Sequence, residues 1–183
     1  MHTLILGGSG FIGFALAKQL ASEGHRLTLV DNLSRGKMDQ EFSEFLSQNP
    51  ECTFIELDLT APIPDQLLPE KYNYVFTTGG IGPTHDDITS ESLAEAFNIT
   101  YEINSEAYNI LEQYYPEGEF NISRQKMAKM PSDVELIYNP MTAAPGFKVR
   151  NVFVLPGVPK IMEQMLQDVL LKLKRVSQKK LQL

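Results

Sequence analysis

The sequence predicts an α/β fold, a three-layer sandwich with a mostly parallel, Rossmann-like sheet. Short apolar runs alternate with segments of helical spacing along the 183 residues. This alternation predicts parallel strands joined by helices that cover both faces of one sheet. Two of the runs lead directly into glycine-rich loops, as at ligand sites beyond the carboxyl ends of parallel strands. Since no linker-like segment interrupts the pattern, we expect a single domain over residues 1–183.

The front part of the chain is expected to hold four strands and two helices. In the first helix Ile12, Leu16 and Leu20 recur at helical spacing, with Gly24 as the C-cap. Asp39 is expected to cap the second helix. The expected strands are 3–8, 26–31, 52–59 and 72–78, and the expected helices are 11–24 and 39–49.

The rest of the chain is expected to hold four helices and two strand segments. Pro159 stands in the first turn of the last helix, and an apolar stripe from Ile161 to Leu173 is typical of a helix face in the core. The expected helices are 88–97, 104–115, 122–130 and 159–176, and the expected strands are 134–139 and 147–157.

Composition limits the kinds of partner and compartment. The net charge of −7 argues against duplex nucleic acid, which is bound through clustered cations. Cys52 is the only cysteine, so no disulfide can form within the chain, as is usual in a reducing cytoplasm. No apolar run approaches the length of a membrane span, and the N-terminus shows no signal-peptide pattern. We therefore expect a cytoplasmic protein with a small-molecule partner and no membrane contact, and leave a homo-oligomer open.

The first glycine loop is typical of dinucleotide binding. Gly7, Gly10 and Gly13 give G-x-x-G-x-x-G between a strand and a helix. Gly7 can make the turn, Gly10 lets a pyrophosphate approach the backbone, and Gly13 permits close helix–strand packing. Asp31 ends the next strand, where a carboxylate accepts the ribose hydroxyls of NAD, although Arg35 nearby leaves NADP open. The alternative is a turn that only packs a helix on the sheet.

Residues 1–76 resemble the extended short-chain dehydrogenases, the group that includes nucleotide-sugar epimerases. The resemblance rests on "LILGGSGFIGFALAKQLASEGHRLTLVDNLSRGK", "FIELDLT" and "PEKYNYVF". It implies NAD binding by Gly7, Gly10, Gly13 and Asp31. That family's chemistry needs a Tyr-x-x-x-Lys pair, and none of the seven tyrosines is followed by lysine four residues later. The resemblance therefore implies dinucleotide binding without epimerase or dehydrogenase turnover.

The second glycine loop, "VFTTGGIGPTHDD", ends in two adjacent aspartates. Thr78, Gly79, Gly80 and Gly82 offer hydroxyl and backbone N–H groups to a ligand at the end of a strand. Asp86 and Asp87 either cap the following helix or hold a divalent cation against phosphate oxygens. A further open turn, "NPMTAAPG", brings in Thr142 and Gly146 as candidate contacts to a phosphate or pterin.

Residues 75–173 resemble the molybdopterin-binding domain family, which includes molybdenum-cofactor biosynthesis proteins and the N-terminal domain of CinA proteins. The matching motifs are "TTGGIGPTHDD", "RQKMAKMP", "NPMTAAPGF" and "NVFVLPGVPKIMEQML". The resemblance implies a pterin or adenine nucleotide as ligand. It further implies pyrophosphate hydrolysis with Mg²⁺ on Asp87, and with Asp86 and Asp87 as catalytic residues. Two families would then be joined within "YVFTTGG", as a chimera with an epimerase-like half (1–76) and a molybdopterin-binding-like half (77–175).

Three functions stay open from the sequence. The first is the pterin or nucleotide domain, with or without catalysis. The second is a non-catalytic NAD(P)-binding module that uses the first loop. The third is a stable hybrid with no competent site.

Overall fold

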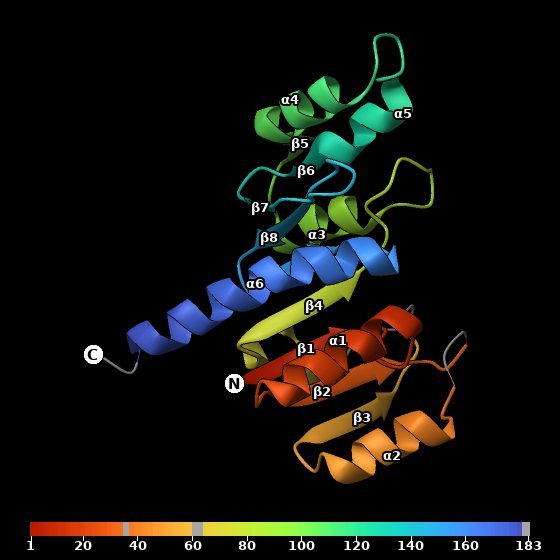
Figure 1. Ribbon diagram of the computed structural model, residues 1–183, viewed down its shortest axis with the longest axis vertical. Coiled ribbons are helices and arrows are strands. Elements are labelled where there is room, and N and C mark those ends of the chain that lie inside the picture. The colour runs from red at the N-terminus through yellow and green to blue at the C-terminus, as the bar shows by residue number, and fades with distance from the viewer. Residues whose placement is uncertain (35–36, 60–63, 181–183) are drawn as a thin grey trace. The chain divides into compact units, whose positions relative to one another are not determined.

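The computed structural model describes residues 1–34, 37–59 and 64–180 (Figure 1). Its backbone contacts divide the chain into two compact units, which are described separately. The first unit comprises Met1–Thr78 and Arg150–Val154, and the second comprises Gly79–Val149 and Leu155–Leu183. The predicted fold class, α/β with a mostly parallel sheet flanked by helices, is confirmed. The single domain stays a prediction.

The first unit contains a parallel sheet with helices. Its elements are β1 (His2–Leu6), α1 (Phe11–Ser22), β2 (Arg26–Asp31), α2 (Gln40–Gln48), β3 (Cys52–Glu56), the short 3₁₀ turns η1 (Asp65–Leu67) and η2 (Pro69–Lys71), β4 (Tyr74–Thr78) and most of β9 (Val152–Leu155). The strand order is β3-β2-β1-β4-β9. Strands β1 and β4 are direct neighbours, because Leu4 lies opposite Val75 in a parallel pair.

The order of the strands creates a topological switch point in the first unit. The chain winds from β1 through β2 to β3 and then returns to β4 on the other side of β1. The Asn151 carbonyl accepts the Val75 amide at 3.0 Å and the Leu155 carbonyl accepts the Gly79 amide at 2.8 Å, so β9 runs parallel to β4. In such sheets ligands bind beyond the carboxyl ends of the strands at the switch, here the ends of β1 and β4.

Apolar packing holds the helices of the first unit on its sheet. Leu16, Ala17 and Leu20 of α1 are fully buried. The Phe42 ring of α2 meets Phe14 of α1 and Phe54 of β3 edge-on, at centroid distances of 5.1 and 5.3 Å. Figure 1 shows α1 lying along β1 and β2.

The predicted N-cap of α2 is confirmed, whereas the C-cap residue of α1 is Glu23, one residue before the predicted Gly24. The Asp39 Oδ1 atom accepts the Phe42 amide at 2.9 Å at the start of α2. Gly24 follows α1 with φ of +79°, the left-handed conformation expected where a helix ends.

The second unit consists of helices and two antiparallel strand pairs. Its elements are α3 (Thr89–Phe97), β5 (Tyr101–Ile103), α4 (Ser105–Tyr114), α5 (Ile122–Gln125), η3 (Lys126–Ala128), β6 (Lys129–Pro131), β7 (Glu135–Ile137), β8 (Gly146–Val149) and α6 (Pro159–Lys180). Strand β5 pairs with β6, and β7 pairs with β8. The predicted core stripe of α6 is confirmed, with Met162, Met165, Leu166, Val169, Leu170 and Leu173 buried. Among the described residues no helix is long and apolar enough to cross a membrane.

One predicted helix of the second unit was wrong. The segment 122–130 was expected to be a single helix, but it forms the short turns α5 and η3 and then strand β6. Met130 is buried opposite Glu102 in the β5–β6 pair. Tertiary pairing therefore overrides the helical spacing.

Candidate functional site

The first glycine loop wraps between β1 and α1. The amides of Gly7 and Gly8 both donate to the Val30 carbonyl, at 2.8 and 3.0 Å, and Gly7 has φ of +78°. A Cβ on Gly13 would stand 2.0 Å from the Gly7 carbonyl oxygen. The fold itself thus explains two of the three predicted glycines, one as the turn and one as the close helix contact.

Gly10, the remaining glycine of the motif, has no such explanation within the fold. It is the N-cap of α1 with φ of −68°, and a Cβ there would meet only the Gly7 oxygen, at 3.4 Å. Next to it, Ser9 is 9% exposed, and its buried Oγ has no hydrogen-bond partner among the described residues. Room for a side chain and an unsatisfied hydroxyl at a helix N-terminus are the features that a bound phosphate would account for.

Asp31 lies at this loop, as the sequence predicts. Its Oδ2 accepts the Ser9 amide at 3.2 Å and its Oδ1 accepts the Leu33 amide at 3.0 Å. Each oxygen keeps a second lone pair, so the carboxylate can still accept hydroxyl donors. Arg35, the residue that left NADP open, lies outside the described residues.

The second glycine loop begins directly after β4, which ends at Thr78. Gly79 and Gly80 have φ of +87° and +69°. A Cβ on Gly80 would stand 2.0 Å from Thr89 Oγ1, and one on Gly82 would stand 2.6 Å from Asp87 Oδ2. The local fold therefore requires glycine at Gly79 and Gly80, whatever the loop binds, and a side chain at Gly82 would displace the Asp87 carboxylate.

Asp87 braces this loop. Its Oδ2 accepts the Thr84 amide at 2.9 Å and the Thr84 hydroxyl at 2.5 Å, and Lys126 Nζ donates to the Thr84 carbonyl at 2.5 Å. Burial raises the pKa of the Asp87 carboxyl, but hydrogen bonds from Thr84 and Gly82 and the charge of Lys126 outweigh burial. The pKa consequently lies below its ordinary value.

The alternative that the aspartates cap α3 was wrong. The N-cap residue of α3 is Ile88, and no side chain caps it. Asp87 instead bonds back to Thr84, three residues earlier. Asp86 is exposed, and hydrogen bonding from Thr84 is the main cause that lowers the pKa of its carboxyl. Within the described part of the chain, no group of three or more His, Cys, Asp or Glu side chains could hold a metal ion.

A cavity of about 310 Å³ opens beside the second glycine loop, entirely within the second unit. Its walls come from four segments of the chain, and its polar side chains are Asp87, Asn139 and Thr142. We call it the second-unit cavity. It is lined by Gly79, Gly80, Ile81, Gly82, Pro83, Asp87, Met127, Asn139, Thr142, Ala144, Pro145, Pro156, Gly157, Val158 and Ile161.

Asn139 organises one wall of the second-unit cavity. Its Nδ2 donates to Thr142 Oγ1 at 2.6 Å and to the Ala144 carbonyl at 3.1 Å. Its Oδ1 accepts the amides of Met141 and Thr142, at 2.9 and 3.2 Å. This buried amide holds the turn open in one conformation.

Of the two ligand contacts predicted in that turn, only Thr142 lies at the cavity. Gly146 is buried in β8 opposite Ile137 and does not line the cavity, so a ligand contact from Gly146 stays a prediction without support from the geometry.

The sequence analysis did not single out two residues that shape this region, Asn139 and Lys126. Asn139 directly precedes "PMT", and an Asx turn there was the available signal. Lys126 reaches Thr84 across 42 residues, and no local pattern reveals such a contact.

Comparison with known proteins assigns the region that contains this cavity to a protein family. Residues 53–175 match the family described as probable molybdopterin binding domain. The chain belongs to this family. The match begins at residue 53, upstream of the resemblance that the motifs predicted from residue 75.

Relatives from two organisms are similar to part of this chain. A protein of Archaeoglobus fulgidus is 40% identical over 98 residues, which cover 54% of this chain and 42% of the relative. A CinA-like protein of Citrifermentans bemidjiense is 41% identical over 103 residues, which cover 53% of this chain and 25% of the relative. The aligned part thus spans about two-fifths or less of these relatives.

The fold is also similar to a solved CinA. The crystal structure of CinA from Thermoplasma acidophilum, a protein of unknown function, aligns with a TM-score of 0.57 and 25% identity over 91% of this chain and 94% of that one. A UDP-galactose 4-epimerase covers 42% of this chain with a TM-score of 0.29, too small a likeness to support an argument. The joining of two families therefore stays a hypothesis.

Proposed function

We propose that the second unit binds a pterin or adenine nucleotide in the second-unit cavity. The observation that carries the proposal is the lining: mostly apolar side chains and glycine and proline turns, with Asp87, Asn139 and Thr142 as the polar groups. Ligand sites usually combine such apolar walls with a few fixed polar groups. Membership in the molybdopterin-binding family supports the same class of ligand.

The finer proposal is hydrolysis of a diphosphate at Asp87 with Mg²⁺. A single carboxylate fits magnesium only when phosphate oxygens and water complete the coordination shell, which is how Mg²⁺ commonly binds in nucleotide sites. When bound, the cation would polarise the diphosphate. The chain's own contribution is a carboxylate that Thr84 holds in place and whose lowered pKa keeps it ionised.

The bond changes of this reaction are simple. The oxygen of a water molecule bonds to one phosphorus, and the bridging oxygen leaves with the other phosphate. The protons of the water pass to the products and to solvent. Asp86, exposed beside Asp87, has room to meet the diphosphate from the solvent side, and we propose it as the second carboxylate.

The test of the cavity is a titration with a matched pair of variants. FAD, ADP-ribose and a pterin nucleotide are titrated calorimetrically into the parent, into Ala144→Leu and into Ala96→Leu, with and without magnesium. Ala144 lines the cavity, whereas Ala96 is exposed on α3. We expect Ala144→Leu to weaken binding at least tenfold and Ala96→Leu to leave it unchanged. No binding to the parent, or equal binding to both variants, would contradict the proposal.

A second candidate function is NAD(P) binding at the first glycine loop. It is favoured by the unpartnered Ser9 hydroxyl and by the space at Gly10. The test is a thermal shift of the parent with millimolar NAD or NADP, compared with Gly10→Val, whose side chain would fill the phosphate position. If neither nucleotide shifts the parent, this function is excluded. If the cavity titration also fails, the chain is a stable fold without a competent site.

A further inference from the structure

A cavity of about 550 Å³ lies within the first unit, at the amino ends of its strands. Its lining includes the first residue of each of three strands, His2 of β1, Arg26 of β2 and Cys52 of β3. We call it the amino-edge cavity. The first glycine loop follows the carboxyl end of β1, so the two places lie at opposite edges of the sheet. The volume is in the range of about 300–1,000 Å³ that is usual for small-molecule sites.

His25 gives the amino-edge cavity a buried polar group. The residue is 7% exposed, and its Nδ1 atom lies 2.9 Å from Oγ1 of the fully buried Thr3. Within the described part of the chain the other ring nitrogen, Nε2, has no hydrogen-bond partner, and it is not enclosed, so it is open to the cavity that the residue lines. Burial and the charge of the α-amino group lower the pKa of the imidazole, against the charge of Glu23, so the ring is neutral at pH 7. The Thr3 contact fixes the direction in which Nε2 can bond a ligand.

Two opposite charges line the amino-edge cavity without pairing. Arg26 and Glu51 each stand one residue before the paired residues Leu27 and Cys52, and the Glu51 carbonyl accepts the Leu27 amide at 3.0 Å. The two side chains are therefore neighbours in the fold. Among the described residues, however, neither charged group has an oppositely charged group within 4.0 Å.

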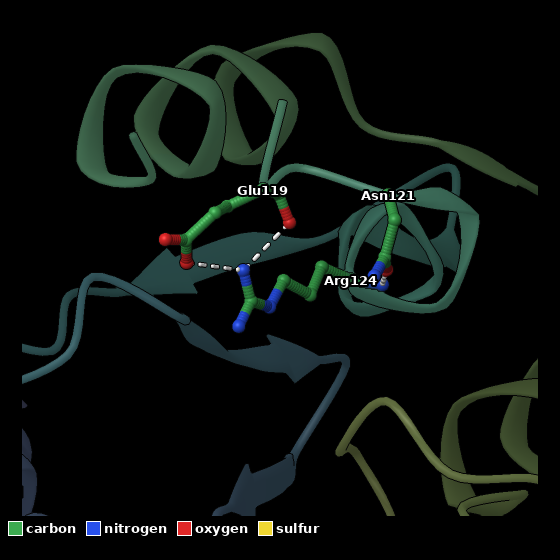
Figure 2. Close-up of polar contacts among 3 residues, drawn as sticks. All are labelled: Glu119, Asn121 and Arg124. Atoms are coloured by element: carbon green, nitrogen blue, oxygen red, sulfur yellow. Dashed lines mark hydrogen bonds and ion pairs between the residues drawn. The ribbon is translucent and has the colours of Figure 1, made fainter. Parts of the chain in front are cut away.

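A satisfied arginine elsewhere in the protein shows what Arg26 lacks. Figure 2 shows Arg124 of the second unit, whose Nη1 donates to the Glu119 carbonyl at 2.6 Å and to Glu119 Oε2 at 2.9 Å. The Arg124 backbone amide is also used, because the Asn121 side chain accepts it at 3.0 Å. Within the described residues the exposed Arg26 side chain donates no such bond. Its guanidinium group is therefore available to a carboxylate from solution.

The helices of the first unit add a negative potential to the same cavity. Ala21 in the last turn of α1 and Gln48 at the end of α2 both contribute to its lining. The carboxyl end of a helix carries a partial negative charge that favours cations nearby. Together with Glu51 these helix ends provide a place for an ammonium group, beside the place that Arg26 provides for a carboxylate.

We infer that the amino-edge cavity binds a small zwitterion of the α-amino-acid class. The carboxylate of the ligand meets the Arg26 guanidinium, which can donate two parallel hydrogen bonds, and the ammonium group meets Glu51 and the helix ends. Nε2 of His25 remains for a polar group of the ligand's side chain. Neighbouring charges that do not neutralise each other match a molecule that carries both signs. The inference does not rest on the proposed function.

The site is one of binding rather than of catalysis. Cys52 is the nucleophilic residue type in the lining, but burial raises the pKa of its thiol, and the charge of Glu51 raises it further. A hydrogen bond with the Leu27 backbone opposes these effects without outweighing them. The thiol is therefore protonated near pH 7 and is a poor nucleophile.

The test compares one amino acid with two derivatives. The standard L-amino acids are screened by thermal shift of the full chain at millimolar concentration, and the tightest is titrated calorimetrically beside its amide, which lacks the carboxylate, and its N-acetyl form, which lacks the ammonium group. We expect each derivative to bind the parent about tenfold more weakly than the free amino acid. Arg26→Gln should weaken the free amino acid about tenfold and leave the amide unchanged, and Glu51→Gln should do the same while leaving the N-acetyl form unchanged.

The controls are Lys71→Gln and Glu70→Gln, which remove exposed charges from another part of the first unit and should bind like the parent. Arg26 and Glu51 are exposed, so thermal unfolding without ligand should match the parent in every variant. Absence of binding by every standard amino acid overturns the inference. Equal affinity for the free amino acid and both derivatives also overturns it, as does parent-like binding by both Arg26→Gln and Glu51→Gln. Equal losses in the control variants would show a general effect of charge and overturn it too.

Discussion

The two glycine loops read alike in sequence but differ in what their glycines do. In the second loop Gly79 and Gly80 have positive φ, and a side chain on Gly82 would meet Asp87 at 2.6 Å. The fold thus requires glycine at Gly79 and Gly80 and constrains Gly82 through Asp87. In the first loop Gly10 has an ordinary φ and space for a Cβ. A glycine that the fold does not require is better evidence for a ligand than one that it does.

The difference changes the basis of each functional argument. The second loop supports ligand binding through its cavity and the polar groups that line it, because its glycines are already explained. The first loop supports it through Gly10 and the unsatisfied hydroxyl of Ser9. Substitutions at single glycines test this distinction.

The largest effect on stability is expected from Gly13→Ala. The new methyl group would stand 2.0 Å from the Gly7 oxygen and 2.8 Å from its carbon, both backbone atoms that cannot move aside cheaply. We expect a loss of about 3 kcal/mol in the free energy of unfolding. Urea denaturation measures it. A loss below about 1 kcal/mol would show that the turn and α1 can separate without cost.

A smaller loss is expected from Gly80→Ala in the second loop. The substitution forces alanine to φ of +69° and places its Cβ 2.0 Å from Thr89 Oγ1. We expect about 2 kcal/mol of destabilisation in the same assay. Because the clash is with a side-chain oxygen, the double variant Gly80→Ala, Thr89→Ala should recover part of that loss. Neutral behaviour of the single variant would remove the claim that the fold requires glycine here.

Asp87→Asn is expected to affect ligand binding far more than folding. The amide oxygen of asparagine can still accept the Thr84 amide and hydroxyl, so the loop should keep its shape. The negative charge is lost, and we expect magnesium-dependent ligand affinity or diphosphate cleavage to fall about tenfold, roughly 1.4 kcal/mol. Calorimetry with and without magnesium measures it on both proteins. Identical titrations would end the metal proposal.

Gly10→Ala is expected to change stability by less than about 1 kcal/mol, since the site is a helix N-cap with space for a methyl group. The same variant should bind NAD at least tenfold more weakly than the parent if the first loop holds a pyrophosphate. Thermal unfolding and NAD titration on one preparation compare the two effects. Unchanged NAD affinity would show that the first loop does not bind the pyrophosphate of NAD.

The smallest effect is expected in the dependence of stability on acidic pH. A carboxyl group whose pKa is lowered in the folded state binds a proton more readily in the unfolded state. Its contribution to the free energy of unfolding is therefore fully present above the ordinary pKa near 3.8, and it is lost as the pH falls through the lowered pKa. Asp87→Asn should therefore flatten the decline of stability below about pH 4. Urea denaturation at several acidic pH values measures the slope. A parallel decline in both proteins would show that Asp87 does not contribute.

Sequence patterns were most reliable where the signal is local. The strand-to-glycine transitions at Gly7 and Gly79, the Asp39 cap and the core stripe of α6 depend on spacing within a few residues, and all appear in the structure. Local spacing failed at β6, where pairing with β5 across nearly thirty residues decides the conformation.

The candidate site was predictable in its residues but not in its connections. Asp31 was expected near the first loop and lies there, because an acid at the end of β2 must meet the turn after β1. The role of Asp87 as a brace and the contact from Lys126 could not be predicted, since each depends on how a loop folds back on itself.

Asn151 has a consequence for the way the protein is made. Its side chain donates to the carbonyls of Pro69 and Tyr72, at 2.8 and 3.1 Å, and its own carbonyl accepts the Val75 amide. The strand that completes the edge beyond β4 is thus synthesised last among the strands of its sheet. A nascent chain that has left the ribosome only as far as Thr78 presents β4 as an open edge, a template for pairing with other chains. Slow translation between Gly79 and Arg150 would prolong that exposure, so the yield of folded protein should depend on the speed of elongation across the second unit.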